Sequence, residues 1–372
     1  MRKLCIILLL CFISLVGCEE EPLDVGEKVK NAEEPSLIHP PKDHLSAPKQ
    51  EVPNLQLDRS SFHSIIGWLN DKEILFVLVE KGKWTVQAYS IDSGNWRVIY
   101  ETDTPIIQVE LHPSKSMLML HTSKNSSSAD VLLVNIDGEL EQSLHFESAE
   151  MYMNWHPTNP QLIVFSAFYE DWSFNSFVYD GETKNLEAID VENPFVKWYD
   201  DQHLMLFEWK ESNLDGSDLV LYSIKEKEKK ETKWKNMLDV IYMGDTYLFI
   251  QIDEEAKEFR YELTNKDSAE KFEWITPALS NYSEWIIPNL SILSPNQVMM
   301  LQPTKGGNVD SIQQENILTN YSLSGKKELG KIESLPIDCS PSGDVCLGGY
   351  EKQIWIQTEP FQEKNWVEID ES

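Results

Sequence analysis

From residue 61 onward, short apolar runs alternate with polar turns, with a period in the forties. Each unit opens on an apolar strand and turns sharply into a second strand rich in Leu, Ile, Val and Phe. After a variable loop, a third strand with alternating apolar positions follows, and then a weaker polar fourth strand. Apolar runs with a period of 2, separated by turn residues, predict β-strands. We expect little helix, because no long segment has the 3.6-residue period of an amphipathic helix.

Seven such units can be counted. The second strand of each unit is expected at 74–79, 117–120, 162–165, 204–207, 247–252, 298–301 and 345–347. The third strands follow at 84–91, 131–136, 177–179, 219–224, 259–263, 317–323 and 354–356. Four strands per unit and this period predict an all-β fold, a β-propeller of four-stranded blades over residues 60–372. Units five and six are the most diverged, so a count of six blades stays open beside seven.

The first turns of four units resemble one another. Pro in the second position suits a tight turn. The four turns read His112-Pro113-Ser114-Lys115, His156-Pro157-Thr158-Asn159, Ser294-Pro295-Asn296-Gln297 and Ser340-Pro341-Ser342-Gly343. They resemble the Ser-Pro-Asp-Gly turns of TolB-type propellers, although the Asp is missing here. The resemblance supports the fold and implies no activity, because propellers host many functions.

The first 18 residues have the pattern of an export signal. Arg2 and Lys3 precede an apolar run over 4–16, too short to span a membrane. The ending Leu15-Val16-Gly17-Cys18 resembles the lipobox of bacterial lipoproteins. This resemblance implies that residues 1–17 are a lipoprotein signal peptide and that Cys18 carries the lipid of a membrane anchor. The alternative is an ordinary signal peptide that happens to end in Cys.

Residues 18–59 are expected to be a disordered tether. The segment is acidic and rich in Pro, and it contains no aromatic residue. Such a composition does not offset the entropy cost of folding. Near its end, residues 54–57 alternate weakly, and this stretch is a candidate for a strand that closes the domain.

Lipobox, tether and propeller repeats together resemble the YqgU-like lipoproteins of spore-forming Gram-positive bacteria. The resemblance covers residues 60–370 of the propeller. It implies a propeller of six blades and no assigned activity. It also implies a location on the extracytoplasmic face of the cell membrane, held by the lipid.

The formal net charge is −30, and loss of Arg2 and Lys3 with the signal makes it −32. This charge argues against nucleic acid as a partner, because nucleic-acid binding needs a basic surface. It also argues against a broad electrostatic attraction to anionic lipid. Two interpretations of the negative charge are left. It keeps the protein soluble outside the cell, or it attracts a cation or a basic partner.

The motif search predicts no cofactor and no metal. The sequence has no His-x-x-x-His pair, no Gly-x-Ser-x-Gly motif and no phosphate-binding loop. His112 and His156 occupy the same position in successive units, so we interpret them as turn residues rather than ligands. No set of residues in the sequence identifies a catalysed reaction.

Cys339 and Cys346 flank a predicted hairpin turn at Ser342-Gly343 symmetrically. This arrangement sets the two cysteines directly opposite each other on antiparallel strands, within reach of a disulfide. We therefore predict a cross-strand disulfide. The alternative is a pair of buried thiols.

The loops between second and third strands are long in four units, at 122–130, 167–176, 209–218 and 302–315. In a propeller these loops all emerge on one face, around the mouth of the central channel. Insertions gathered on one face of a repeat protein usually mark its binding face. Aromatic and acidic side chains on two of the loops are the candidate ligand-binding residues, namely Tyr169, Asp171, Trp172, Trp209, Glu211 and Asp215.

These features predict a binding or scaffold module. Its partner would be another envelope protein or a cell-wall glycan or peptide. The alternative is a propeller enzyme, a lyase or hydrolase that acts at the channel mouth. An apolar, solvent-exposed patch at the mouth would favour a protein partner, whereas buried carboxylates would favour the enzyme.

Overall fold

The computed structural model describes residues 52–148, 150–208, 210, 212, 214–333 and 336–370. The predictions on the signal peptide, Cys18, Trp209 and Glu211, and on residues 18–51 of the tether, lie outside the described residues. The described part consists of strands joined by turns and loops, without a helix. Within this part there is accordingly no helix with the length and apolarity that a membrane span requires.

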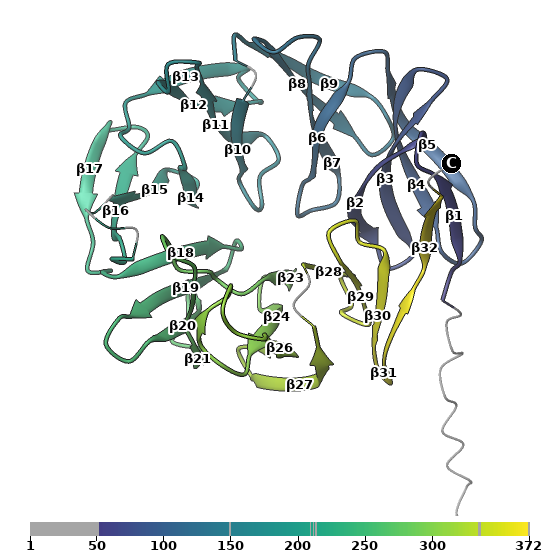
Figure 1. Cartoon of the computed structure of the whole chain (residues 1–372). Helices are drawn as coiled ribbons and strands as arrows, with labels where there is room; N and C mark the ends of the chain where they lie inside the picture. Colours follow the sequence, from purple (N-terminus) through teal and green to yellow (C-terminus); the bar gives the residue numbers. More distant parts are fainter. Residues whose placement is uncertain are drawn as a thin grey trace, which may run out of the picture. The chain divides into compact units, whose positions relative to one another are not determined.

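Seven four-stranded antiparallel sheets form the blades of a ring (Figure 1). In every blade the four strands follow one another in chain order. The first strand of each blade lies toward the centre of the ring and the fourth lies at its rim (Figure 1). The fold is therefore a β-propeller, as predicted, and the described residues form seven blades.

The first four blades have nearly equal spacing. Blade 1 consists of β2 (Phe62–Asn70), β3 (Glu73–Glu80), β4 (Lys83–Ser90) and β5 (Trp96–Thr102). Blade 2 consists of β6 (Ile106–Leu111), β7 (Met117–Thr122), β8 (Ala129–Asn135) and β9 (Leu140–Phe146). Blade 3 consists of β10 (Glu150–Trp155), β11 (Leu162–Phe168), β12 (Phe174–Asp180) and β13 (Asn185–Ile189). Blade 4 consists of β14 (Lys197–Asp200), β15 (His203–Glu208), β16 (Asp218–Ser223) and β17 (Glu228–Glu231).

The last three blades contain one insertion. Blade 5 consists of β18 (Met237–Tyr242), β19 (Thr246–Asp253), β20 (Glu258–Asn265) and β21 (Lys271–Pro277). Blade 6 consists of β23 (Leu290–Ser294), β24 (Gln297–Pro303), β26 (Asn316–Ser322) and β27 (Gly325–Ile332). Blade 7 consists of β28 (Ile337–Cys339), β29 (Val345–Gly348), β30 (Ile354–Thr358) and β31 (Phe361–Asn365). The insertion is a short parallel pair, β22 (Leu279–Ser280) with β25 (Gly307–Asn308), at blade 6.

The two ends of the described chain meet between blades 7 and 1. Strand β1 (Leu55–Asp58) pairs in parallel with β32 (Val367–Asp370), with Leu55 opposite Val367. Leu55, Leu57 and Ile369 pack against the apolar cluster that blades 1 and 7 share. The weak alternation at 54–57 thus belongs to a strand that helps to close the ring.

Seven clusters of buried apolar side chains hold the ring together, one between each pair of neighbouring blades. The second strands supply many of these side chains, because they are covered by sheet neighbours and by blades on both sides. All six residues of β7 are buried, and so are Ile74 to Leu78 in β3. This explains why the second strands read as continuous apolar runs in the sequence.

Connections alternate between the two faces of the ring, because successive strands are antiparallel. We call the face that carries the connections between second and third strands, and those between blades, the loop face. We call the opposite face the turn face. Strand β22 belongs to the connection between blades 5 and 6, and β25 belongs to the connection between the second and third strands of blade 6. Because these two strands pair, both kinds of connection lie on the same face.

The predicted hairpin lies in blade 7, on the turn face. Cys339 in β28 is directly opposite Cys346 in β29. The structure has a disulfide between them, with the two Cα atoms 3.8 Å apart. Both cysteines are buried in the cluster between blades 6 and 7, so the bond is covered by apolar side chains.

Candidate ligand-binding pocket on the loop face

A cavity of about 1220 Å³ opens on the loop face over blades 2 and 3 and the connection into blade 4. We call it the loop-face pocket. Strands β6, β7, β10, β11 and β12 contribute to it, and so do the connections between the blades. It is lined by Ile107, Gln108, His121, Ser126, Ser127, Glu147, Ser148, Glu150, Met151, Tyr152, Phe168, Tyr169, Glu170, Trp172, Phe174, Glu192, Pro194 and Phe195.

Aromatic rings form much of the wall of the pocket. The Phe195 ring centroid lies 5.4 Å from that of Tyr152 and 6.1 Å from that of Phe168. Phe174 extends the group on the other side of Phe168, at 6.3 Å. Half of the Phe195 surface is exposed, and Ile107 is 55 % exposed. The pocket therefore presents apolar surface to solvent.

Trp172 stands at the tip of the loop between β11 and β12. Its backbone has a φ of 66°, and its N–H donates to the Tyr169 carbonyl oxygen at 3.0 Å. A residue other than Gly in this left-handed region costs about 1 kcal/mol or more. The tight turn leaves the indole 91 % exposed at the edge of the pocket, which is unusual for so large an apolar side chain.

Titratable groups continue from the pocket along the first strands of blades 2 to 5, which are β6, β10, β14 and β18. Gln108 Nε2 donates to Oε1 of Glu110, two residues further along β6, at 2.8 Å. Burial raises the pKa of Glu110 to about 7. Burial, and then the charges of Asp239 and Glu110, raise the pKa of Tyr152. Asp239 itself pairs with Lys197 at 2.5 Å.

The candidate residues from the sequence are divided between separate places. Tyr169 and Trp172 line the pocket. Asp171 belongs to the same loop, where its Oδ1 accepts the Ser173 N–H at 3.0 Å and the Ser173 Oγ–H at 2.5 Å. The Ser173 hydroxyl and then the Ser173 N–H lower the pKa of the Asp171 carboxyl. Asp171 thus shapes the turn that exposes Trp172.

Asp215 lies away from the pocket, in the connection between β15 and β16. The Asp215 N–H donates to the Ser212 carbonyl oxygen at 3.0 Å. The neighbouring Leu214 carbonyl oxygen accepts the Trp285 Nε1–H at 2.7 Å, which holds this loop toward the connection between blades 5 and 6. The structure therefore does not bring Asp215 together with Tyr169 and Trp172.

Several pocket residues were not expected from the sequence. Glu147, Glu150 and Phe195 come from the connections between blades or from the strand ends beside them. His121 lies in the buried strand β7 and is 3 % exposed. The signal that could have identified the first three is topological, because connections between blades share the loop face with the long loops.

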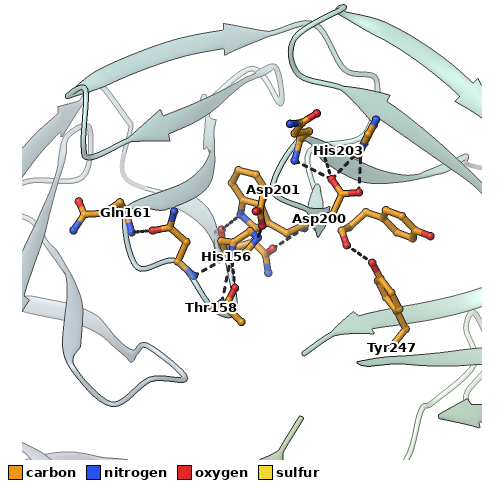
Figure 2. Close-up of polar contacts among 12 residues, drawn as sticks. His156, Thr158, Gln161, Asp200, Asp201, His203 and Tyr247 are labelled. Atoms are coloured by element: carbon orange, nitrogen blue, oxygen red, sulfur yellow. Dashed lines mark hydrogen bonds and ion pairs between the residues drawn. The ribbon is translucent and has the colours of Figure 1, made fainter. Parts of the chain in front are cut away.

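His112 and His156, which recur at the same turn position of successive units, make structural contacts on the turn face. Figure 2 shows His156 beside Asp201, with His156 Nε2 3.0 Å from Asp201 Oδ1. His156 Nδ1 accepts the Asn159 N–H at 3.1 Å. Burial lowers the pKa of both His112 and His156. These contacts support the interpretation of the two histidines as turn residues.

A second cavity, of about 1030 Å³, lies on the same face over blades 6 and 7. Leu279, Val309 and Ile312 from the β22–β25 insertion line it, together with Tyr350. No group of three or more His, Cys, Asp or Glu side chains within the described ranges is placed to hold a metal ion.

Fold and site together define a seven-bladed β-propeller with an open aromatic pocket on its loop face. The chain belongs to the family described as the YqgU-like 6-bladed beta propeller domain, whose model matches residues 90–349. The match begins at the last residue of β4 and ends just after β29, so most of blade 1 and half of blade 7 lie outside it. The family description names six blades, whereas the part of this chain that the structure describes forms seven.

Known proteins similar to this chain agree with the fold. The chain is 26 % identical over 235 residues to the "Uncharacterized lipoprotein YqgU" of Bacillus subtilis strain 168, which covers 63 % of this chain and 61 % of that protein. A crystal structure of the uncharacterized protein lmo1340 from Listeria monocytogenes EGD-e superposes with a TM-score of 0.77 at 18 % identity, over 87 % of this chain and 99 % of that one. An oligogalacturonate lyase from Vibrio parahaemolyticus has a TM-score of 0.54 at 12 % identity, over 78 % of this chain and 86 % of that one. At these identities the two structures show a shared fold alone.

Proposed function

We propose that this protein is a lipid-anchored, extracytoplasmic binding module that holds a segment of another envelope protein in the loop-face pocket. The observation that carries the proposal is the exposed aromatic surface at the pocket. Trp172 is 91 % exposed, and Phe195 and Ile107, which line the same pocket, expose about half of their surface. Exposed apolar patches mark interaction sites, and large aromatic side chains dominate the energy of protein interfaces.

The anchor is supported by the lipobox-like Leu15-Val16-Gly17-Cys18 and by the B. subtilis relative, which is called a lipoprotein. Cys18 would carry the lipid, and residues 18–59 would tether the propeller outside a membrane of the Gram-positive type. Cys18→Ala should release the protein into the medium or stall its processing. A variant that is processed and retained at the membrane like the wild type would contradict the anchor.

The alternative function is a lyase or hydrolase at the channel mouth. Glu110 favours it, because a carboxyl group with a pKa of about 7 suits general acid–base catalysis. We favour binding, because the exposed surface around Trp172 has no role in that chemistry. Glu110→Gln separates the two functions, since it would abolish catalysis but leave a protein partner bound through the aromatic residues.

Photocrosslinking in living cells tests the proposed surface. The crosslinking amino acid p-benzoylphenylalanine would replace Trp172 in one strain and Tyr282 in another. Tyr282 is a suitable control because it is 83 % exposed on the loop face but does not line the pocket. We expect a discrete crosslinked protein from position 172 and not from position 282. Crosslinks only from position 282, or the same crosslinks from both, would place the partner elsewhere.

A further inference from the structure

The loop-face pocket has carboxylates and no cation in its lining. Glu147, Glu150, Glu170 and Glu192 line it, and no Lys or Arg does. Glu192 is ion-paired with Lys229 at 3.3 Å. No such pair joins Glu147, Glu150 or Glu170 to a basic residue in the part of the chain that the structure describes. The three carboxylates are therefore available to an external positive charge.

A buried polar atom in the same pocket also lacks a partner. His121 is 3 % exposed and lines the pocket, and its Nε2 has no hydrogen-bond partner among the described residues. Burial lowers the pKa of His121, so the ring is neutral at pH 7. Leaving such a group unsatisfied costs about 1–3 kcal/mol. A bound ligand with polar N–H groups would satisfy it if the Nε2 is unprotonated.

A third feature is the aromatic edge of the pocket. The exposed indole of Trp172 and the ring of Tyr169 stand on the same loop as Glu170. A cation over such a ring gains about 0.5–2 kcal/mol, with the larger value where water is excluded. Aromatic faces beside unpaired carboxylates form an environment that favours ammonium and guanidinium groups.

Strand β6 adds a fourth unpaired carboxylate beside the pocket, that of Glu110. Glu110 accepts a hydrogen bond from the lining residue Gln108 and has no ion-pair partner among the described basic residues. Lys197, in the first strand of blade 4, is already ion-paired with Asp239. Burial without a cation leaves Glu110 partly protonated near neutral pH, and an incoming positive charge would stabilise its ionised form.

The size of the pocket indicates which kind of cation fits. Sites for small molecules usually have volumes of about 300–1000 Å³, and this cavity has about 1220 Å³ and opens to solvent. We infer that the ligand is an extended segment of the partner protein whose Lys or Arg side chain enters the pocket beside Trp172, facing Glu147, Glu150 and Glu170. This inference rests on the proposed function. It names the chemistry of the partner segment.

Selection of random linear peptides displayed on phage tests the inference, with the full chain immobilised in detergent micelles. The pocket variant is Glu147→Gln/Glu150→Gln/Glu170→Gln. The matched control is Glu182→Gln/Glu226→Gln/Glu270→Gln, which changes the net charge by the same amount at exposed turns on the turn face. A third variant, Trp172→Ala, reports whether a peptide uses the pocket at all.

We expect the selected peptides to be rich in Lys or Arg next to apolar residues. A synthetic copy should bind the pocket variant about tenfold more weakly or worse, which equals about 1.4 kcal/mol, and should bind the control within about twofold of the wild type. Added NaCl should weaken the binding. Equal weakening by both triple variants would mean attraction to net charge alone, and would overturn the inference.

Two other outcomes separate the inference from the proposed function. Selected peptides without Lys or Arg, whose binding is lost in Trp172→Ala, would keep the pocket as a peptide site and overturn its preference for cations. Failure to select any peptide that depends on Trp172 would contradict the proposed function itself. Displacement of the basic peptides by an equal concentration of spermidine would place a small polyamine, not a protein segment, in the pocket.

Discussion

His112 Nε2 lies 2.8 Å from the backbone carbonyl oxygen of His156, 44 residues further along the chain and one blade further round the ring. His112 Nδ1 accepts the Ser114 N–H at 3.0 Å, so the proton is on Nε2 and donates to that carbonyl. The His112 ring also packs edge-on against Trp155 at 4.9 Å. One side chain thus closes its own turn and joins two blades.

Replacement of His112 tests this blade contact. His112 is completely buried, and His112→Ala leaves a cavity and an unsatisfied carbonyl group. We expect the free energy of unfolding to fall by about 2–4 kcal/mol, measured by denaturant titration. His145→Ala is the control, because that side chain is 61 % exposed on an outer strand, and it should cost less than about 1 kcal/mol. Equal losses would contradict the structural role of His112.

Glu110 should make stability depend on pH. Burial raises the pKa of Glu110 from 4.5 to about 7, so between these values the folded state binds a proton that the unfolded chain has released. This contribution to stability is full below pH 4.5 and is lost as the pH rises through 7. The change in the free energy of unfolding that Glu110→Gln causes, relative to the wild type, should therefore be more stabilising at pH 8 than at pH 4.5 by about 2–3 kcal/mol.

Denaturant titration of Glu110→Gln at the two pH values measures this gain. Glu182→Gln serves as the control, since Glu182 is exposed in the turn between β12 and β13, and it should show no pH-dependent difference from the wild type. If Glu110→Gln has the same effect at both pH values, the carboxyl group is not buried as described.

The Cys339–Cys346 bond gives a third prediction. The two cysteines are seven positions apart in the sequence, and closing so short a loop should contribute about 2–3 kcal/mol in the chain-entropy model. We expect the free energy of unfolding of Cys339→Ser/Cys346→Ser, measured by denaturant titration, to be lower than that of the wild type by this amount. In the denatured purified propeller, a thiol reagent should find neither cysteine free until a reductant is added. Two free thiols without reductant would rule out the bond.

Closure of the ring gives a fourth prediction. Ile369 in β32 packs against the cluster shared by blades 7 and 1. Ile369→Asp places a charge in this contact and should raise hydrogen exchange in β2 to β5 and in β28 to β31. Blades 3 and 4 lie across the ring (Figure 1) and should keep their protection. Uniformly faster exchange in all blades would show that β1 and β32 do not stabilise one particular junction.

Much of the fold could be predicted because each blade repeats the same local pattern of apolar strands and polar turns. The apolar runs at 74–79 and 117–120 lie in β3 and β7, where burial on both sides requires continuous apolar residues. The divergence of units five and six also has a cause. The β22–β25 insertion lengthens the connection into blade 6 and the loop within it, which obscures the repeat.

The pocket could be predicted only in part. The sequence indicated the loop with Tyr169 and Trp172, because this long loop between second and third strands carries aromatic residues beside acidic ones. Glu147, Glu150 and Phe195 converge on that loop only after three blades pack side by side. Their placement depends on contacts between distant residues and on the left-handed backbone at Trp172, and no periodic pattern encodes either.

The central claim is that the loop-face pocket is the binding surface. The most direct measurement is the affinity of the crosslinked partner, once purified, for the wild type, Trp172→Ala and Tyr282→Ala, with all three folded. A central aromatic contact contributes about 2 kcal/mol or more, so Trp172→Ala should bind roughly 30-fold more weakly, and Tyr282→Ala should match the wild type. Wild-type affinity in Trp172→Ala, or loss only in Tyr282→Ala, would contradict the account.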